Sequence, residues 1–572
     1  MDARISNALI QGYESMAAWS DLLDQINIFP VADADTGRNL RISLAPLRRL
    51  GEQAGAVSQA ILNTATGNAG NIAAAFFREV LMESTHLGML SRAISRGARR
   101  AYTAVADPKP GTMLSVFDAL AGTLPTAPPE QWPMAAIVTV LEKSVVDSSQ
   151  TLPELRRAGV VDAGALGIFI FMEAFLNALA GKSNHQRPVT ERFQGRLRIL
   201  GPWQPERQEQ QYCVSAVIRP QGDPAEARRH LEEWGQSVVV NQEQEQLKVH
   251  LHTTDRDALQ IGMAQIGHVL QWSDEKIHVA RRREEIPNQP VHIMTDAAGS
   301  ITLEDAQSLG MTLLDSYLVM GDAATPETLH DPAALYAAMA VGQRVSTAQA
   351  SVFQRHQSYM SALSRFEEVL YLCVGSVYTG NFETATAWQA AHDAGRRLTI
   401  IDTGAASGRL GIVALAAARY ARQGHAIDAV AQFARQAVAQ SQELVFLDQL
   451  KYLAAGGRIS KTKGFFGDLL HMRPIITPTA QGAAQVGVAR SREDQLVFAL
   501  RWLQAGFDAG AAPLILLQYS DNRSWVEETV AAQIRSLLPP AAILLRPLSL
   551  TSGAHMGPGT WAVASLPAAF NL

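Results

Sequence analysis

Hydrophobic residues in the first third of the chain follow the spacing of helices. They recur three and four positions apart from Ile5 to Ile26, from Leu40 to Leu50 and from Ile61 to Met82, which places the apolar side chains of each segment on one helical face. The alternation of strands is nearly absent here. The pattern predicts an all-α domain over residues 1–185, followed by a polar, irregular linker.

A shorter segment of mixed character comes next. Tyr212 to Ile218 and Leu247 to Thr253 alternate like strands, and a helical pattern around residues 225–234 separates them. A charged, proline-containing segment, residues 281–290, then marks a boundary. We therefore expect a small α/β domain over residues 200–283.

Strand and helix patterns alternate along the rest of the chain. Val291 to Met294 reads as a strand, Leu303 to Leu309 as a helix and Thr312 to Val319 as a strand. This order predicts an α/β domain over residues 290–572 with a largely parallel sheet.

Composition narrows the functional classes. The 572-residue chain has a formal charge of −5, with 49 basic and 54 acidic residues interspersed, so it lacks the basic footprint of a nucleic-acid-binding protein. Its two cysteines, Cys213 and Cys373, argue against a disulfide framework and for a reducing compartment. The N-terminus lacks the apolar core of a signal peptide, and the most apolar run, Ala163 to Met172, is too short for a transmembrane segment. We expect a cytoplasmic protein.

Candidate chemistry begins in the loop from Ile26 to Leu40. Asp33 and Asp35 lie two residues apart, and Thr36 is expected to cap the helix that follows. Converging carboxylates beside the exposed N–H groups of a helix suit a divalent cation that carries the phosphates of a nucleotide. The alternative is a turn whose carboxylates only cap the helix.

The residues around these aspartates favour the first interpretation. The segment that starts at Asn27 resembles N-x-F-P-V-P-D-G-D-T-G-T-N-M, the metal-binding loop of the dihydroxyacetone-kinase L-subunit (DhaL) family in the form carried by bacterial fatty-acid kinases. Ala32, Ala34 and Arg38 depart from the motif. Ala34 replaces a glycine and narrows the backbone conformations open to the loop. Arg38 adds a cation that either neutralises phosphate charge or obstructs binding.

Three further segments resemble motifs of the same family in the same order. Ile61 to Gly70 resembles L-L-x-G-A-R-G-N-S-G, with Ala69 at the serine. Gly111 to Leu114 resembles E-G-T-I/M-L, with Pro110 at the glutamate. Ala158 to Gly164 matches A-G-V-V-D-A-G.

This resemblance implies a helical barrel with ATP and Mg²⁺ at one end. Asp33 and Asp35 would hold Mg²⁺ and take part in catalysis. The residues expected to shape the nucleotide pocket are Thr36, Asn39, Gly67, Asn68, Gly70, Thr112, Asp162 and Gly164.

A second candidate metal site lies in the middle domain. In a strand, residues two apart face the same way, so His250 and His252 would project together. With Cys213 on a neighbouring strand they offer three ligands for Zn²⁺. Polar surface residues are the alternative for a plain H-x-H. The surrounding Y-C-V and V-H-L-H-T resemble Y-C-T and V-H-V-H-T of the fatty-acid-kinase middle domain, although no fourth ligand can be chosen.

The last half resembles the DegV family, the fatty-acid-binding partners of those kinases, and the resemblance implies a two-lobed α/β fold. The matching motifs are Ile293 to Asp296 with V-T-D-S, Thr347 to Ser351 with T-S-Q-P-S, Val374 to Gly380 with I-S-S-K-L-S-G, Leu450 to Ile476 around G-G-R-I-S-K, and Gly553 to Gly559 with G-T-H-T-G-P-G.

These motifs suit the binding of a carboxylate beside an apolar tunnel. Thr347 and Ser376 can donate hydrogen bonds to the carboxylate, and Arg458 and His555 supply positive charge for substrate binding and for catalysis where an acyl phosphate forms. The alternative is that Gly456-Gly457-Arg458 ends a helix and His555 is an ordinary turn residue.

Together the segments predict a single-chain fatty-acid kinase that transfers the γ-phosphate of ATP to a long-chain fatty acid. We expect a homodimer whose acyl phosphate product is consumed by an acyltransferase. One alternative is a fatty-acid-binding protein with a weak or inactive kinase-like domain. Another is a kinase of dihydroxyacetone or a related small hydroxy-ketone.

Overall fold

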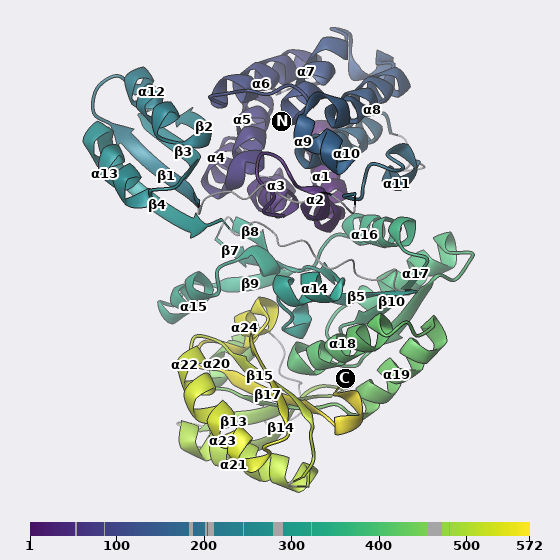
Figure 1. Ribbon diagram of the computed structural model, residues 1–572. Coiled ribbons are helices and arrows are strands. Elements are labelled where there is room, and N and C mark those ends of the chain that lie inside the picture. The colour runs from purple at the N-terminus through teal and green to yellow at the C-terminus, as the bar shows by residue number, and fades with distance from the viewer. Residues whose placement is uncertain are drawn as a thin grey trace. The chain divides into compact units, whose positions relative to one another are not determined.

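The chain folds into two compact units, Met1–Arg282 and Arg283–Leu572 (Figure 1). The helical and middle domains predicted from the sequence both belong to the first unit. The computed structural model describes residues 1–51, 54–84, 86–181, 187–200, 203, 211–243, 245–277, 290–321, 323–455, 472–479, 481–508 and 510–571.

Helices build the first part of the first unit, as the apolar spacing predicts. They are α1 (Ala3–Ala17), α2 (Ser20–Ile26), α3 (Thr36–Leu44), α4 (Ala54–Thr64), α5 (Gly67–Glu83), α6 (Leu90–Ala104), α7 (Met113–Thr123), α8 (Met134–Thr151), α9 (Pro153–Ala158), α10 (Ala163–Leu179) and α11 (Val189–Arg192).

Helix α10 is the core helix of this part. Its sequence offers no polar stripe, and every residue from Ala163 to Leu176 is buried, because a helix that is apolar on all sides is stable in water only inside a core. Helix α1 approaches it closely: a Cβ atom at Gly12 would lie 2.6 Å from the Phe171 ring. Among the described residues, none of the helices combines the length and apolar character that a membrane span requires.

An antiparallel sheet with two helices forms the rest of the first unit. Its strands follow the order β2-β3-β1-β4, and α12 and α13 cover one face (Figure 1). Strand β3 alternates as predicted: Leu247, Val249 and Leu251 join that core, whereas the residues between them face the other way. The elements are β1 (Tyr212–Pro220), α12 (Pro224–Trp234), β2 (Gln236–Glu243), β3 (Gln246–Thr253), α13 (Arg256–Ile266) and β4 (Gly267–Lys276).

The sheet is attached to the helices through its backbone and polar side chains. Val105 forms a β-bridge with Val239. The Lys248 ammonium donates to the carbonyl groups of Leu62 and Asn63 at the end of α4, where a cation complements the helix dipole. These contacts explain why the two predicted domains form one compact unit.

The second unit has two main sheets. One contains β5 (Val291–Asp296), β6 (Thr312–Leu314), β10 (Glu368–Cys373) and β11 (Leu398–Asp402), all parallel, in the order β11-β10-β5-β6. The other contains β12 (Gln442–Phe446), β13 (Arg473–Thr479), β14 (Gly482–Ala489), β15 (Leu514–Tyr519), β16 (Ala542–Pro547) and β17 (Trp561–Leu566), in the order β14-β13-β12-β17-β15-β16.

The prediction of a largely parallel sheet is wrong for this second sheet. Among its described strands, only β15 and β16 are parallel. Strand β13 ends at Thr479 and β14 begins at Gly482, and a connection this short can join only antiparallel strands.

Helices and a small sheet complete the second unit. The small sheet, in the order β8-β7-β9, contains β7 (Tyr317–Met320), β8 (Ala323–Pro326) and β9 (Val345–Ala348). The helices are α14 (Leu303–Leu309), α15 (Pro332–Ala340), α16 (Val352–Arg365), α17 (Asn381–His392), α18 (Ser407–Arg422), α19 (Ile427–Gln440), α20 (Leu450–Ala455), α21 (Arg492–Gly506), α22 (Arg523–Trp525), α23 (Ala531–Leu537) and α24 (Leu550–Met556).

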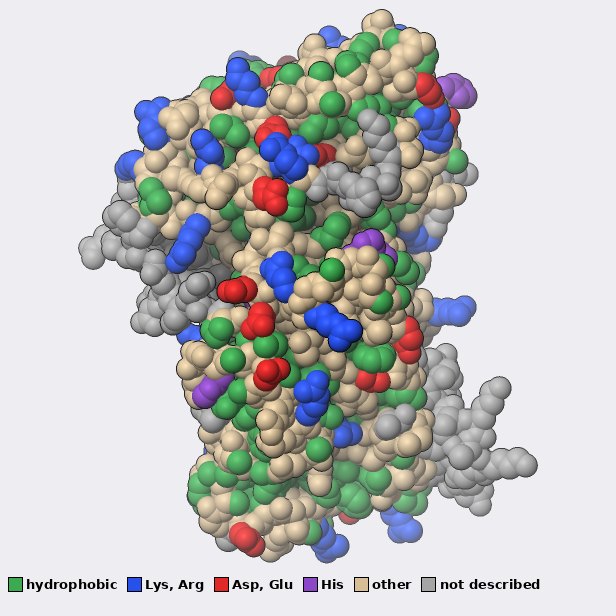
Figure 2. Space-filling model, turned by 90° about the vertical axis from the view of Figure 1, so that its right-hand side faces the viewer, with side chains coloured by type: hydrophobic (Ala, Val, Ile, Leu, Met, Phe, Trp, Pro, Cys, Tyr) green, Lys and Arg blue, Asp and Glu red, His purple; other side chains and the backbone are tan. Residues whose placement is uncertain are grey.

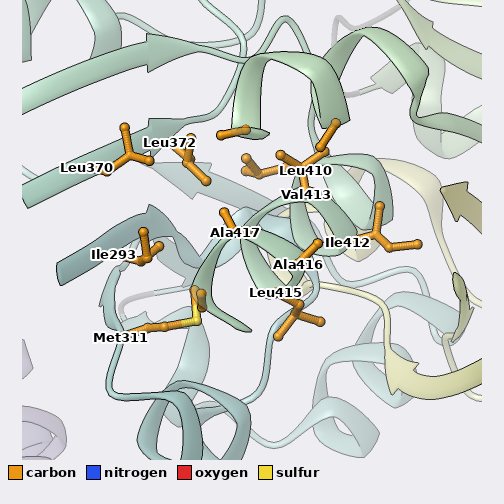
Figure 3. Packing of buried hydrophobic residues seen from close by; sticks show 14 of the residues in the cluster. Ile293, Met311, Leu370, Leu372, Leu410, Ile412, Val413, Leu415, Ala416 and Ala417 are labelled. Carbon is orange, nitrogen blue, oxygen red and sulfur yellow. The ribbon is translucent and has the colours of Figure 1, made fainter. Parts of the chain in front are cut away.

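Helix α18 connects the two main sheets. It contacts β5 and β10 of the parallel sheet and β12, β15 and β17 of the other. Figure 3 shows Leu410 and Val413 of this helix packed toward Leu372 of β10. Small residues allow the close approach: a Cβ atom at Gly411 would lie only 1.8 Å from the carbonyl oxygen of Gly299.

Surface charge follows the interspersed pattern of the sequence. On the face shown in Figure 2, basic and acidic side chains lie among one another rather than in a patch of one sign.

Candidate functional site

A cavity of about 220 Å³ opens between the helices and the antiparallel sheet of the first unit. Most of the predicted site residues of this unit line it, although they come from distant parts of the chain. They are Asp33, Asp35, Thr36, Asn39, Gly67, Asn68, Thr112, Asp162, Gly164, Cys213, His250 and His252. The two predicted metal sites therefore share one pocket.

Gly70 is the exception among the predicted nucleotide residues. It is not among the described residues that line the cavity. A Cβ atom there would lie 2.1 Å from the Ser43 hydroxyl and 3.1 Å from the Asn39 carbonyl oxygen. The glycine thus lets α5 pack against α3, which is a structural role.

Asn27 and Asp24 fix the loop that carries the two aspartates. The Asn27 side-chain oxygen accepts hydrogen bonds from the backbone N–H groups of Asp35 (3.0 Å) and Thr36 (3.3 Å). Asp24 accepts from the N–H groups of Gly37 (2.7 Å) and Arg38 (3.1 Å). The prediction that Thr36 caps the helix is therefore wrong: α3 begins at Thr36, and its first turn is satisfied by Asp24, which lies before the loop.

Burial and a neighbouring charge act on Asp33. Burial raises the pKa of Asp33 well above its usual value, and the neighbouring Asp35 carboxylate raises it further. Two carboxylates that line one cavity favour a bound cation that offsets their charge. The geometry suits the predicted Mg²⁺ site.

Ala34 and Arg38, which depart from the family motif, take up positions that the structure explains. Ala34, which stands at the glycine of the motif, adopts a left-handed backbone conformation with φ of 56°. Arg38 points back along the loop, with its Nε 3.9 Å from Asp24 and a terminal nitrogen 3.5 Å from the Ala34 carbonyl oxygen. It is not among the described residues that line the cavity, so it does not obstruct the pocket here.

We expect Ala34→Gly to stabilise the protein. A Cβ atom in the left-handed region destabilises the folded chain by about 1–2 kcal/mol. Removing it recovers only part of this amount, because glycine also gives the unfolded chain more conformational freedom. A gain of about 1 kcal/mol in the free energy of unfolding is expected in denaturant titrations of the full chain. Ala32 is a buried alanine of the same loop without a positive φ. Ala32→Gly should therefore lower the free energy of unfolding. A loss of stability in Ala34→Gly would contradict the assigned strain.

Four helices begin at the pocket. The first residues of α3, α5 and α7 and the N-cap of α10 are among its lining. Asp24 satisfies the first turn of α3, and Asp162 caps α10 by accepting from the Ala165 N–H (2.7 Å). Helices α5 and α7 have no capping side-chain hydrogen bond among the described residues. The N–H groups at the starts of α5 and α7 are thus the ones most available to donate hydrogen bonds to a bound anion.

Cys213, His250 and His252 form a cluster on the pocket face of the sheet. One ligand atom from each lies within 4.8 Å of the others, because Cys213 pairs with His252 across β1 and β3. The Cys213 sulfur is 3.9 Å from Nδ1 of His250. The predicted shared orientation of the two histidines is confirmed, and their ring centroids are 5.3 Å apart.

The chemical state of this cluster fits a metal. Burial lowers the pKa of His252 to about 4 and that of His250 well below its usual value, so both rings are neutral and can coordinate. Nε2 of His250 and Nδ1 of His252 are buried, and neither has a hydrogen-bond partner among the described residues. Burial also raises the pKa of the Cys213 thiol to about 12, and the Asp35 carboxylate adds to this. A zinc ion would offset the cost of burying the unpaired ring nitrogens and of deprotonating the thiol.

In the second unit the structure brings together two of the four predicted carboxylate-binding residues. The Thr347 hydroxyl on β9 lies 3.1 Å from Nε2 of His555 on α24. Apolar residues of β7, α15 and α24 pack beside this pair; they are Leu318, Leu335, Tyr336, Met339, Leu550 and Ala554.

Ser376 and Arg458 are not part of this contact. Ser376 is exposed, and its hydroxyl donates to Asp402 at 2.5 Å while its N–H donates to the same carboxylate at 3.1 Å. Its hydroxyl must leave Asp402 before it can donate to a fatty-acid carboxylate. Arg458 lies outside the described residues.

Sequence reasoning missed several lining residues. Asp107 and Lys109 precede α7, and Ser237, Val238 and Val239 belong to β2. The β2 residues lie beside the segment before α7 through contacts such as the bridge between Val239 and Val105. No motif in either segment predicts this pairing.

Comparison with known families assigns each part of the chain. Residues 30–177 match the DAK2 domain, residues 209–281 match the FakA-like middle domain of fatty acid kinases, and residues 290–568 match the DegV family of uncharacterised proteins.

Individual relatives cover only part of the chain. An uncharacterized protein of Staphylococcus saprophyticus is 27% identical over 344 residues, which are 54% of this chain and 59% of that protein. An uncharacterized protein of Staphylococcus aureus is 28% identical over 275 residues, 43% of this chain and 50% of that protein. The chain thus spans between half and three fifths of the length of these relatives.

Solved structures resemble about half of this chain. A fatty-acid-binding DegV family protein from Thermus thermophilus is 23% identical, with a TM-score of 0.46, over 49% of this chain and 99% of that one. DegV of Bacillus subtilis, described as a fatty acid binding protein, is 16% identical, with a TM-score of 0.45, over 49% and 99%.

The predicted order of a helical domain, a small middle domain and a C-terminal α/β domain is confirmed. This chain joins a DAK2 domain, a FakA-like fatty acid kinase middle domain and a DegV-family domain in one polypeptide.

Proposed function

We propose that this protein is a single-chain fatty-acid kinase. The observation that carries the proposal is the pocket of the first unit, which Asp33 and Asp35 line together with the open N-termini of α5 and α7. Carboxylates hold a cation, and helix N-termini attract phosphates. These features of the pocket support the proposal that it binds ATP with Mg²⁺.

The match of residues 209–281 to a fatty acid kinase middle domain supports an acyl substrate. For the acid we propose the second unit, where Thr347 and His555 form a polar pair beside an apolar cluster. A carboxylate would accept hydrogen bonds there while its chain stays away from water, which saves about 0.8 kcal/mol per CH₂ group.

The reaction is an in-line phosphoryl transfer. An oxygen of the fatty-acid carboxylate attacks the γ-phosphorus, the bond to the bridging oxygen of ADP breaks, and ADP leaves with the electron pair. Mg²⁺ held by Asp33 and Asp35 would neutralise phosphate charge. The N–H groups of α5 and α7 orient the phosphates, and the transfer needs no protein nucleophile.

A fatty-acid-binding protein with a weak kinase-like domain is the second candidate. The strained Ala34 and the lining residue Ala69, which stands at a serine of the motif, favour it. Release of ADP from ATP and Mg²⁺ distinguishes the two candidates. A kinase releases ADP in proportion to added long-chain fatty acid, whereas a binding protein releases none above background. A lipid extract of the purified protein identifies the acid to add.

We expect the Cys213, His250 and His252 cluster to hold zinc. Purified wild-type protein should contain about one zinc ion per chain by elemental analysis. The double variant His250→Ala, His252→Ala should lose it, and His268→Ala, an exposed histidine of β4, should keep it. Equal zinc content in the double variant and the wild type would exclude this cluster as the site.

A further inference from the structure

The pocket of the first unit is rich in acids and poor in bases. Asp33, Asp35, Asp107 and Asp162 line it, and Lys109 is the sole lysine or arginine among the described lining residues. A nucleotide polyphosphate would therefore meet one formal positive charge from the protein in this pocket.

Other positions near the pocket do not supply a positive charge for the phosphates. The guanidinium of Arg38 turns toward Asp24 and the Ala34 carbonyl oxygen. Thr66 stands where the motif L-L-x-G-A-R-G-N-S-G has an arginine, so the loop before α5 brings no charge. The cation comes instead from the loop before α7.

Lys109 lies beside an open helix end. The Thr112 hydroxyl donates to the Lys109 carbonyl oxygen at 2.9 Å and closes the turn that leads into α7. The Lys109 ammonium lies 2.7 Å from the Asp107 carboxylate, with 49% and 77% of the two side chains exposed. An ion pair this exposed contributes little and exchanges readily, so the ammonium can leave Asp107 for a phosphate.

We propose that Lys109 binds the terminal phosphates of the nucleotide, and that Asp107 is the partner it leaves to do so. The role rests on the proposed function and deepens it, because it makes Lys109 a determinant of preference for ATP over AMP. The phosphates would lie between the ammonium and the N-terminus of α7, where a charge-assisted hydrogen bond and helix N–H groups act together.

Nucleotide titration of the full chain with Mg²⁺ tests the affinity. Lys109→Ala should weaken ATP binding roughly 10-fold and AMP binding less than about 2-fold, as expected for a lost hydrogen bond between charged groups. Asp107→Asn should tighten ATP binding, because it frees the ammonium. Lys143→Ala, an exposed lysine of α8 outside the pocket lining, should match the wild type.

Chemical labelling of lysine amines tests the contact itself. Saturating ATP with Mg²⁺ should protect Lys109 from acetylation, AMP should not, and Lys143 should react equally in all samples. The role of Lys109 alone would be overturned by two results together. Lys109→Ala would bind ATP as tightly as the wild type, and ATP would not protect Lys109 of the wild type from acetylation. A wild-type chain that binds neither ATP nor ADP would overturn the proposed function as well.

Discussion

Asp33→Asn and Asp35→Asn are each expected to abolish phosphoryl transfer, with turnover at least on the order of 10³-fold lower. Asparagine keeps the size of the side chain but removes the charge that a divalent cation requires. The position of the two carboxylates supports this expectation, because both line the pocket at which α5 and α7 begin. Turnover is measured as ADP release with ATP, Mg²⁺ and a long-chain fatty acid.

The lipid serves as an internal control for these variants. Thr347 and His555 lie in the other compact unit, so native mass spectrometry should find the same fatty-acid load as in the wild type. Asp118→Asn, an exposed aspartate of α7 outside the pocket lining, should retain turnover. Wild-type rates in both Asp33→Asn and Asp35→Asn would remove these carboxylates from the mechanism.

Arg355→Ala is expected to destabilise the second unit by about 3–5 kcal/mol, because it leaves a buried carboxylate without its counter-ion. Arg355 and Asp296 are both 3% exposed, and their side chains lie 2.9 Å apart. The hydroxyl of Tyr371, the amide of Asn381 and the N–H of Val374 also donate to Asp296. Asp296 therefore joins β5, β10, α16 and α17.

Denaturant unfolding and hydrogen exchange of the full chain measure this effect. Amides of β5 and β10 should lose protection in Arg355→Ala, while those of α10 in the first unit should not. Arg344→Ala, an exposed arginine of the same unit, should change stability by less than about 0.5 kcal/mol. A cost below about 1 kcal/mol in Arg355→Ala would show that the buried pair does not hold these elements together.

Local patterns predicted the residues that act within one segment. The period of two along β3 placed His250 and His252 on one face, and the spacing of Asp33 and Asp35 placed both carboxylates in one loop. In each case the geometry follows from neighbours in the chain.

Local sequence patterns do not predict contacts between distant segments. The cap of α3 comes from Asp24, which lies 13 residues before Gly37, and no local rule prefers it to Thr36. The partner of Ser376 is Asp402, 26 residues later, and the pairing depends on the parallel register of β10 and β11. The approach of β2 to Val105, which brings the cysteine and histidine cluster to the aspartates, likewise depends on tertiary packing.

Detection of the acyl phosphate tests the central claim most directly. Purified full-length protein is incubated with ATP, Mg²⁺ and a long-chain fatty acid, and hydroxylamine converts any acyl phosphate to a hydroxamate that mass spectrometry identifies. We predict acyl hydroxamate in amounts equal to the ADP released, and none with Asp35→Asn. ADP release without hydroxamate, or a wild-type protein that forms neither, would contradict a fatty-acid kinase housed in one chain.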